Sequence, residues 1–425
     1  MMRPAPLLIW MALLAAVALP AASTAEPPAP PPSTLTLAEC YALALKRSET
    51  IAMQRELISE ADARFLQAFS GALPRASFIA SEKRQDGSGS SAFTLSEVPE
   101  RKFNATYTLF AGFKEFAAMK GARAEHRQRT QEKARAEQLL LTDVANAFYL
   151  LREQREDLGA LEGTRIALLQ RLEDLSERER LGRSRESEVA SAVAKLRRIE
   201  AETERVRGLE TTARQLLEFL TDVSRIEAVA DADAPMSPME PLEAYLGKAP
   251  SRPDVRAAEE ALTIAKQQVT INRAGFWPTL DVEGNYYTKR VGAAADVDWD
   301  VLALVEVPLF QGGQVVGEVR EASAKARSAA WELSRVRRAA ELDIRDTYAE
   351  AASALDRAEA LAHALDAAED NYRLQAEDYR RNLVNNLDVL DALQDLQDAR
   401  RDALHATYES KRLYWQLRTA VGETL

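Results

Sequence analysis

Apolar residues recur at helical spacing in two long stretches of the chain, residues 113–181 and 313–381. Both stretches consist mostly of Ala, Leu, Glu, Arg, Gln and Lys. In the first, Leu161, Leu168 and Leu175 keep a seven-residue spacing that is typical of a coiled coil. A helix over residues 113–181 would be roughly 100 Å long at about 1.5 Å per residue, which is longer than an ordinary globular domain requires.

The positions of the prolines support this prediction. Of the 17 prolines, none lies between Pro99 and Pro235 or after Pro308, so uninterrupted helices are possible there. We therefore predict that each long helix is followed by a turn and a second helix. These second helices cover residues 187–220 and 387–421, and shorter helices are expected over residues 37–71 and 242–274.

Ahead of each long helix the pattern changes to a period of two, which is typical of β-strands. Residues 75–110 and 278–310 each predict one β-hairpin with a polar loop. Of the four predicted strands, residues 75–83 show the weakest alternation. The alternating apolar positions are Phe103, Ala105, Tyr107 and Leu109 in the first hairpin and Leu280, Val282, Tyr286, Trp299, Val301, Ala303 and Val305 in the second.

The two halves of the chain are copies of each other. Leu-Phe-Ala-Gly at residues 109–112 matches Leu-Phe-Gln-Gly at residues 309–312, an offset of 200. The same offset pairs Asp143 with Asp343, Phe148 with Tyr348, and Gly182 with Asn382. Gly and Asn readily adopt positive φ, which suits a reversal between helices. We predict an internal duplication. Its parts are a first repeat at 26–222, a linker at 223–240 and a second repeat at 241–425.

The N-terminus has the pattern of an export signal. Arg3 precedes an apolar run over residues 7–22, and Ser23-Thr24-Ala25 provides a small-x-small cleavage site before Glu26. We predict a signal peptide at residues 1–25. A transmembrane anchor is the alternative, but the run is short for a span of about 20 residues.

Charge and rare residues narrow the function classes. The net charge of −11 argues against a nucleic-acid partner. Cys40 is the only cysteine and His126, His363 and His405 are scattered along predicted helices, where surface or packing roles are expected. The sequence has no phosphate-binding loop and no Gly-x-Ser-x-Gly motif. We predict no enzyme activity, no cofactor and no metal site.

Four amphipathic strands pose a physical problem if one face of each contacts lipid. Four strands cannot close a barrel. An open sheet edge in hydrocarbon leaves backbone N–H and C=O groups without hydrogen-bond partners, and each such group costs several kcal/mol. The chain would have to oligomerise to close the barrel. Two isolated soluble hairpins are the alternative, although such hairpins are marginally stable in water.

Two motifs inside this duplication carry a resemblance to a known family. Residues 308–313 read Pro-Leu-Phe-Gln-Gly-Gly, and residues 388–392, beyond the long helix, read Asp-Val-Leu-Asp-Ala. With the alternating strands before them, they resemble the outer-membrane efflux protein family over residues 35–422. The resemblance implies a mainly α fold with a small β part: a long antiparallel coiled-coil barrel and a transmembrane β-barrel that trimerisation completes, with the shorter helices stacked end to end.

The resemblance also implies a function. Such a homotrimer is a passive exit channel in the outer membrane of a Gram-negative bacterium, in contact with outer-membrane lipid and with a long periplasmic portion. Its partners are a periplasmic adaptor and an inner-membrane transporter that supplies the energy. The alternatives are a periplasmic adaptor, which usually has one helical hairpin, or a structural coiled-coil protein of the cell envelope.

Acidic residues near the turns are the candidate pore residues. Asp388 and Asp391 lie three apart and share one helix face. The resemblance implies that they form the periplasmic constriction, together with Glu188 and the gate residue Tyr379. The alternative is a set of solvated charges near a helix N-terminus, where the helix dipole favours acids.

The turns themselves are the adaptor-docking sites that the resemblance implies. The arginines that tie the family's gate shut would fall at Val384 and Thr407, which form no ion pairs, so Arg183, Arg185 and Arg381 are candidate substitutes. The docking residues are Leu181, Gly182, Arg183, Ser184, Arg185, Asn382, Leu383, Val384, Asn385 and Asn386.

Overall fold

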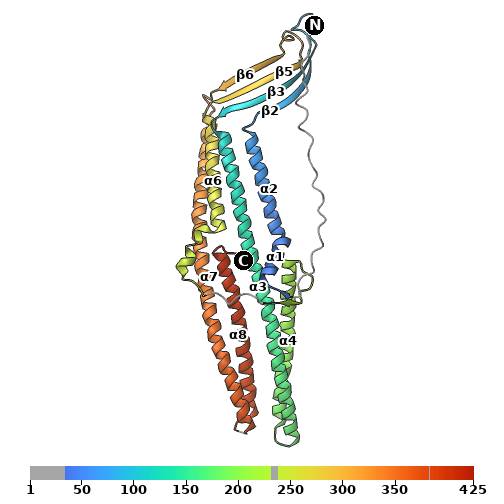
Figure 1. The fold of residues 1–425 in the computed structure, drawn as a ribbon, viewed down its shortest axis with the longest axis vertical. Coiled ribbons are helices and arrows are strands. Elements are labelled where there is room, and N and C mark those ends of the chain that lie inside the picture. Colours follow the sequence, from blue (N-terminus) through green and yellow to red (C-terminus); the bar gives the residue numbers. More distant parts are fainter. Residues whose placement is uncertain (1–33, 231–237, 382) are drawn as a thin grey trace, which may run out of the picture.

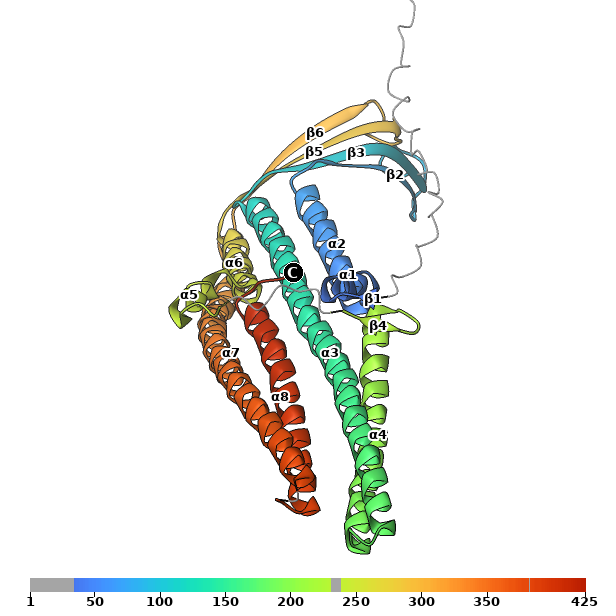
Figure 2. The same ribbon diagram turned by 60° about the horizontal axis from the view of Figure 1, so that its bottom comes forward.

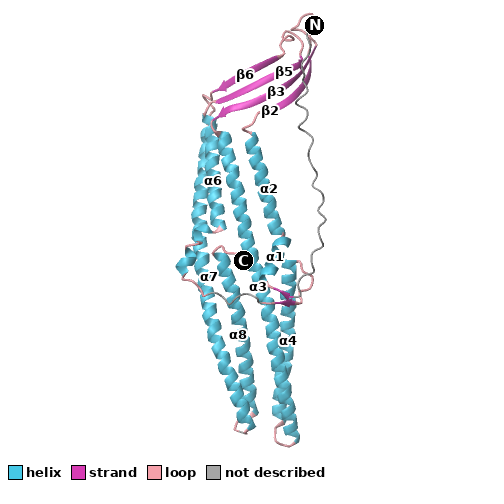
Figure 3. Ribbon diagram, viewed as in Figure 1, coloured by secondary structure: helices cyan, strands magenta, loops and turns pink. Residues whose placement is uncertain are grey.

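The computed structural model describes residues 34–230, 238–381 and 383–425, and in these it consists of long helices with one four-stranded sheet at an end (Figures 1 and 3). The predicted fold class, mainly α with a small β part, is confirmed. The expected signal peptide, part of the expected linker and Asn382 lie outside the described residues.

Two helices of 67 residues each, α3 (Lys114–Arg180) and α7 (Gln314–Arg380), run along the molecule. Both begin directly after a residue with positive φ, Phe113 at 66° and Gly313 at 86°. These left-handed residues turn the chain sharply from the sheet into the helix. Each long helix then reverses into a shorter antiparallel helix, α4 (Glu186–Thr221) or α8 (Asn386–Ala420).

The other helices pack along the halves of α3 and α7 that lie nearer the sheet. Helices α1 (Leu37–Arg47) and α2 (Glu49–Ser70) lie against α3 and continue the line of α4 (Figure 2). Helix α6 (Pro253–Arg273) packs between α3 and α7 and continues the line of α8. The result is a single curved layer of helices, with α7 along one side and α2 and α4 along the other.

Two of the expected shorter helices are interrupted. The helix expected over residues 37–71 breaks at Ser48, whose ψ of 117° is not helical and whose side chain caps α2 by accepting from the Ile51 amide. The helix expected over residues 242–274 is divided into α5 (Leu242–Leu246), the 3₁₀ turn η1 (Ala249–Ser251) and α6, and ends in a second 3₁₀ turn, η2 (Ala274–Phe276). Pro253 forces Arg252 out of the helical region and starts α6.

The strands form one antiparallel sheet in the order β2-β3-β5-β6. The two hairpins join because β3 pairs with β5, with Ala105 opposite Gly284. The bounds are β2 (Arg75–Arg84), β3 (Glu97–Ala111), β5 (Thr279–Lys289) and β6 (Trp299–Glu306), and a short parallel pair, β1 (Thr34–Leu35) with β4 (Ala228–Val229), lies near α1.

The leucines of the predicted coiled coil form the core of the first helical hairpin. Leu161, Leu168 and Leu175 are fully buried against α4 and against Leu390 and Leu393 of α8. Burying each leucine stabilises the hairpin by about 1.5–3 kcal/mol.

None of the helices among the described residues carries an apolar stretch long enough to cross a membrane.

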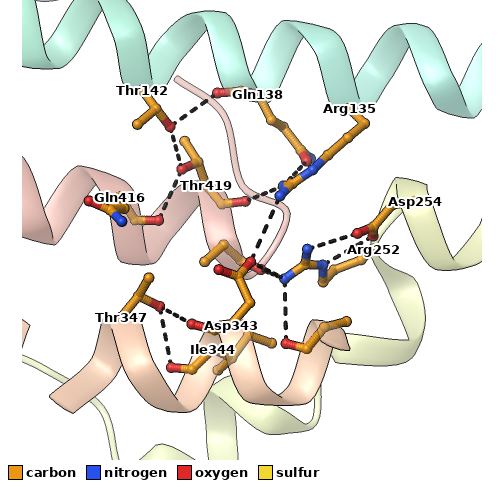
Figure 4. Close-up of polar contacts among 12 residues, drawn as sticks. Arg135, Gln138, Thr142, Arg252, Asp254, Asp343, Ile344, Thr347, Gln416 and Thr419 are labelled. Atoms are coloured by element: carbon orange, nitrogen blue, oxygen red, sulfur yellow. Dashed lines mark hydrogen bonds and ion pairs between the residues drawn. The ribbon is translucent and has the colours of Figure 1, made fainter. Parts of the chain in front are cut away.

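A set of polar contacts fixes the C-terminal end of α8 to three other helices (Figure 4). The buried Arg252 donates to Asp254, to Asp343 of α7 and to the Ala420 carbonyl of α8. Arg135 of α3 donates to the Thr419 carbonyl at 3.0 Å. These bonds satisfy carbonyl groups that the end of a helix leaves without partners.

Candidate functional site

The sheet has one apolar face and one face that carries most of its polar side chains, together with Leu302 and Leu304 of β6. On the apolar face, aromatic side chains such as Phe78, Phe103, Tyr286 and Trp299 are more than half exposed. On the polar face, Asn104 donates to Glu283 at 2.8 Å and to Asn285 at 2.9 Å. An apolar face of this extent on the surface of a chain marks a membrane or protein contact.

Hydrogen bonds between side chains cross the polar face from β3 to β6. Asn285 donates to Asp300 of β6 at 2.9 Å, and Thr108 of β3 donates to Asp281 at 2.6 Å. Carboxylates therefore line this face in fixed positions and have polar partners. A face lined by carboxylates is suited to contact with water.

Strands β2 and β6 are the two edges of this sheet, and within the described residues each pairs with a single neighbouring strand. Strand β2 runs for 10 residues and β6 for 8. Long edges of this kind can pair with a further strand. The edge groups would be unsatisfied in a lipid environment.

The turn between α3 and α4 is a compact glycine-dependent reversal. Gly182 has a φ of 68°, and the amide of Arg183 donates to the Arg178 carbonyl at 2.8 Å. This closes the C-terminus of α3. Leu181 is exposed at the tip, and Ser184 donates to Glu188 in the first turn of α4.

The turn between α7 and α8 ends in a capping box. The Asn385 side chain accepts from the amides of Leu387 and Asp388, and the Asp388 carboxylate accepts from the Asn385 amide at 3.0 Å. Leu383 is exposed, as Leu181 is at the other tip. Asn386, expected at a docking tip, is instead buried and accepts from Arg171 of α3 at 2.8 Å.

Asp391 forms an ion pair that the sequence did not predict. The ammonium group of Lys195, on α4, lies 3.0 Å from Asp391 on α8 and 2.8 Å from the Leu390 carbonyl. The Asp391 side chain is still 60% exposed. The negative charge of Asp391 is therefore partly compensated within the chain, while Asp388 contacts its own helix cap.

Tyr379 lies between two arginines of the other hairpin. The guanidinium carbon of Arg171 is 3.8 Å from the centre of the Tyr379 ring, and that of Arg178 is 4.6 Å away. The tyrosine is buried. A desolvated cation–π contact contributes about 2 kcal/mol. This arrangement holds α7 against α3 near the tips.

These contacts identify the residues that link the tips. Arg381, a candidate from the sequence, lies 4.0 Å from Glu377 of its own helix. Near the tips, Arg171, Arg178 and Lys195 make contacts between the two hairpins. A signal for two of them was present: Arg171 and Arg178 each follow a buried heptad leucine by three residues, which places them on the packed side of α3.

Comparison with known proteins tests the resemblance that the motifs indicated. Residues 249–423, which include the strands β5 and β6 and the second helical hairpin, match the family model "Outer membrane efflux protein". This match confirms the resemblance to the outer-membrane efflux proteins that the motifs indicated, over the second half of the chain. The predicted localisation, the outer membrane of a Gram-negative bacterium with a long periplasmic portion, is confirmed.

Two curated proteins of outer-membrane export systems are similar in sequence to this chain. Outer membrane protein TolC of Vibrio cholerae is 23% identical over 314 residues, which cover 71% of this chain and 72% of that one. Proteases secretion protein PrtF of Dickeya chrysanthemi is 28% identical over 175 residues, 38% of this chain and 36% of that one.

Solved structures share the fold. CusC superposes with a TM-score of 0.79 at 18% identity and covers 91% of this chain and 92% of its own. VceC from Vibrio cholerae also gives 0.79, at 21% identity, over 91% of this chain and 96% of its own. The fold is therefore shared along almost the whole described chain, and not only in the second repeat.

Proposed function

We propose that three copies of this chain form a passive outer-membrane exit channel. The observation that carries the proposal is the two-faced sheet with two open edges. If β6 of one copy pairs with β2 of the next, three four-stranded sheets close into one barrel of twelve strands. The apolar face then contacts lipid and the polar face lines the water-filled interior.

The helical layer supports the same assembly. Exposed apolar side chains lie on α7 at one side of the layer, and others lie on α2 and α4 at the opposite side. Two different sides that bury each other make a head-to-tail interface, which closes into a ring when the rotation fits. The residues are Trp331, Leu342 and Leu355 on α7, Met53 and Leu66 on α2, and Leu209, Leu216 and Phe219 on α4.

The tips of the helical hairpins would form the periplasmic entrance. Asp388 and Asp391 of three copies would give acidic rings there, with Glu188 and Tyr379 nearby. The exposed Leu181 and Leu383 would contact a periplasmic adaptor. The adaptor would connect the channel to an inner-membrane transporter, which supplies the energy that a passive channel lacks.

Reconstitution tests the proposal. The full chain, purified from the outer-membrane fraction, is expected to have the mass of a trimer and to conduct ions across a planar lipid bilayer in uniform steps. A periplasmic adaptor or a structural coiled-coil protein would give no conductance. A monomer that never enters the bilayer would contradict the proposal.

A further inference from the structure

An ionic cluster around two buried carboxylates, Glu153 and Asp157, joins α3 to α8. It lies between the tip contacts and the polar contacts at the C-terminal end of α8. Asp157 of α3 is fully buried, and Arg401 of α8 donates to both of its carboxylate oxygens, at 2.7 and 2.8 Å. Arg401 also lies 2.9 Å from Glu202 of α4. One arginine therefore connects the second hairpin to both helices of the first.

His405 extends the cluster one turn along α8. Its Nδ1 lies 2.6 Å from the buried Glu153 of α3, and its Nε2 lies 4.0 Å from Asp157. Arg412 donates to the other oxygen of Glu153. His405, expected from the sequence to be a surface or packing residue, is thus part of an ion-pair network.

The spacing shows that this network occupies a whole face of α8. Arg401, His405, Tyr408 and Arg412 recur at intervals of four, three and four residues, so they point to the same side. Tyr408 donates to Glu156 of α3 and accepts from Arg152. A face that packs on another helix would ordinarily be apolar.

The ionic contact between α3 and α8 responds differently to separation and to the loss of one of its charged side chains. Separating α3 from α4 would expose Leu161, Leu168 and Leu175 to water. Separating α8 from α3 at the ionic cluster returns charged groups to water, which offsets much of the lost attraction. Removal of one partner, by contrast, leaves an uncompensated buried charge and costs far more.

We propose that Glu153, Asp157, Arg401, His405 and Arg412 form a pH-responsive clamp that positions the second helical hairpin against the first and thereby regulates the channel. The regulatory part of this inference rests on the proposed function. The clamp itself concerns only the relative position of two hairpins of one chain.

The direction of the pH response follows from the groups around His405. Glu153 and Asp157 face it from α3, Glu202 approaches from α4 through Arg401, and Arg401 and Arg412 belong to α8 itself. The hydrogen bond to Glu153 is the largest cause that raises the pKa of His405 above its ordinary value of 6.5. Protonation of His405 and the close approach of α8 to α3 therefore favour each other. The contribution is complete below about pH 6.5 and is lost as the pH rises through the raised pKa.

Distances between spin labels on the two tips test the clamp. Labels at Arg183→Cys and Leu383→Cys, in a Cys40→Ala background, report the separation of the hairpins in the detergent-solubilised full chain at pH 6 and pH 8. The separated population is expected to grow on going from pH 6 to pH 8. Arg401→Gln is expected to raise it at least about tenfold, which corresponds to about 1.4 kcal/mol, at both pH values.

Two variants make the result specific. Arg400→Gln is the matched control, because Arg400 donates to Glu369 of α7 within the same hairpin, and it should behave as the unmodified chain. His405→Gln should abolish the pH response, and it remains informative if Arg401→Gln does not fold, because Arg412 still binds Glu153.

The clamp is overturned if the unmodified chain shows no pH response, if the response survives in His405→Gln, or if a folded Arg401→Gln gives the distances of Arg400→Gln. These distances are measured without ion flow. A chain that fails to conduct would contradict the proposed function and leave the clamp standing.

Discussion

Lys195 of α4 donates a hydrogen bond to Asp391 of α8 at 3.0 Å, and so joins the tip regions of the two repeats. The pair also sets the charge that a pore at this position would present. Asp388, one turn closer to the tip, accepts from the backbone of its own helix cap. The two aspartates are therefore not equivalent, although they share a helix face.

This difference predicts the ion selectivity of the channel. Asp388→Ala and Asp391→Ala should each lower the preference for cations in single-channel recordings, and the loss should be larger for Asp388. Lys195→Gln should raise the cation preference, because it frees the charge of Asp391. Glu204→Gln is the control, because Glu204 lies on α4 and pairs with Arg207 of the same helix. Selectivity that stays unchanged in all three variants would remove these residues from the pore.

The contacts of Tyr379 predict how firmly the tips are held together. Tyr379→Leu removes both cation–π contacts and Arg171→Gln removes one of them, each worth about 2 kcal/mol. The mean conductance should therefore rise several-fold in both variants. Arg165→Gln is the matched control, because Arg165 pairs with Glu162 on the exposed side of α3. Conductance equal to that of the control would show that these contacts do not limit opening.

Gly112 is expected to be essential at the junction of sheet and helix. Its φ is 62°, and a Cβ atom there would lie 2.9 Å from Trp277 and 3.0 Å from Ala274. Gly112→Ala should therefore lower the thermal midpoint of the assembled protein, at a cost of at least about 1–2 kcal/mol. Gly163→Ala, within α3 and with no neighbour inside 4 Å, should be neutral or stabilising by up to about 1 kcal/mol. Equal midpoints would contradict this view of the junction.

The features that the sequence predicted well are those with a period. Leu161, Leu168 and Leu175 are buried as their spacing indicated, and the alternation of Phe103, Ala105 and Tyr107 gave a strand with two unlike faces. Periodicity reports which side of an element is buried. It requires no knowledge of the partner.

The features that the sequence missed depend on partners far away along the chain. Arg171, Lys195 and Arg401 resemble the solvated charges of any long helix, and only the packing of the second helical hairpin on the first gives them their partners. The division near Pro253 is a different case, because the proline was a readable signal for a helix start. The joining of the two hairpins through β3 and β5 has no local signal at all.

The central claim is that neighbouring copies complete the barrel, and cysteine cross-linking between strand edges tests it most directly. Cysteines are introduced in a Cys40→Ala background at Phe78 or Ala80 of β2 together with Val301 or Ala303 of β6. The in-chain partners Ala105 and Gly284 serve as the positive control for disulfide formation in the sheet. Disulfides form when the Cα atoms lie about 4.4–6.8 Å apart.

The account predicts that at least one β2–β6 pair in the membrane-inserted protein forms a disulfide between chains and gives a covalent trimer on a denaturing gel without reductant. If the positive control forms its disulfide while every β2–β6 pair stays monomeric, neighbouring copies do not close the sheet and the channel proposal is wrong.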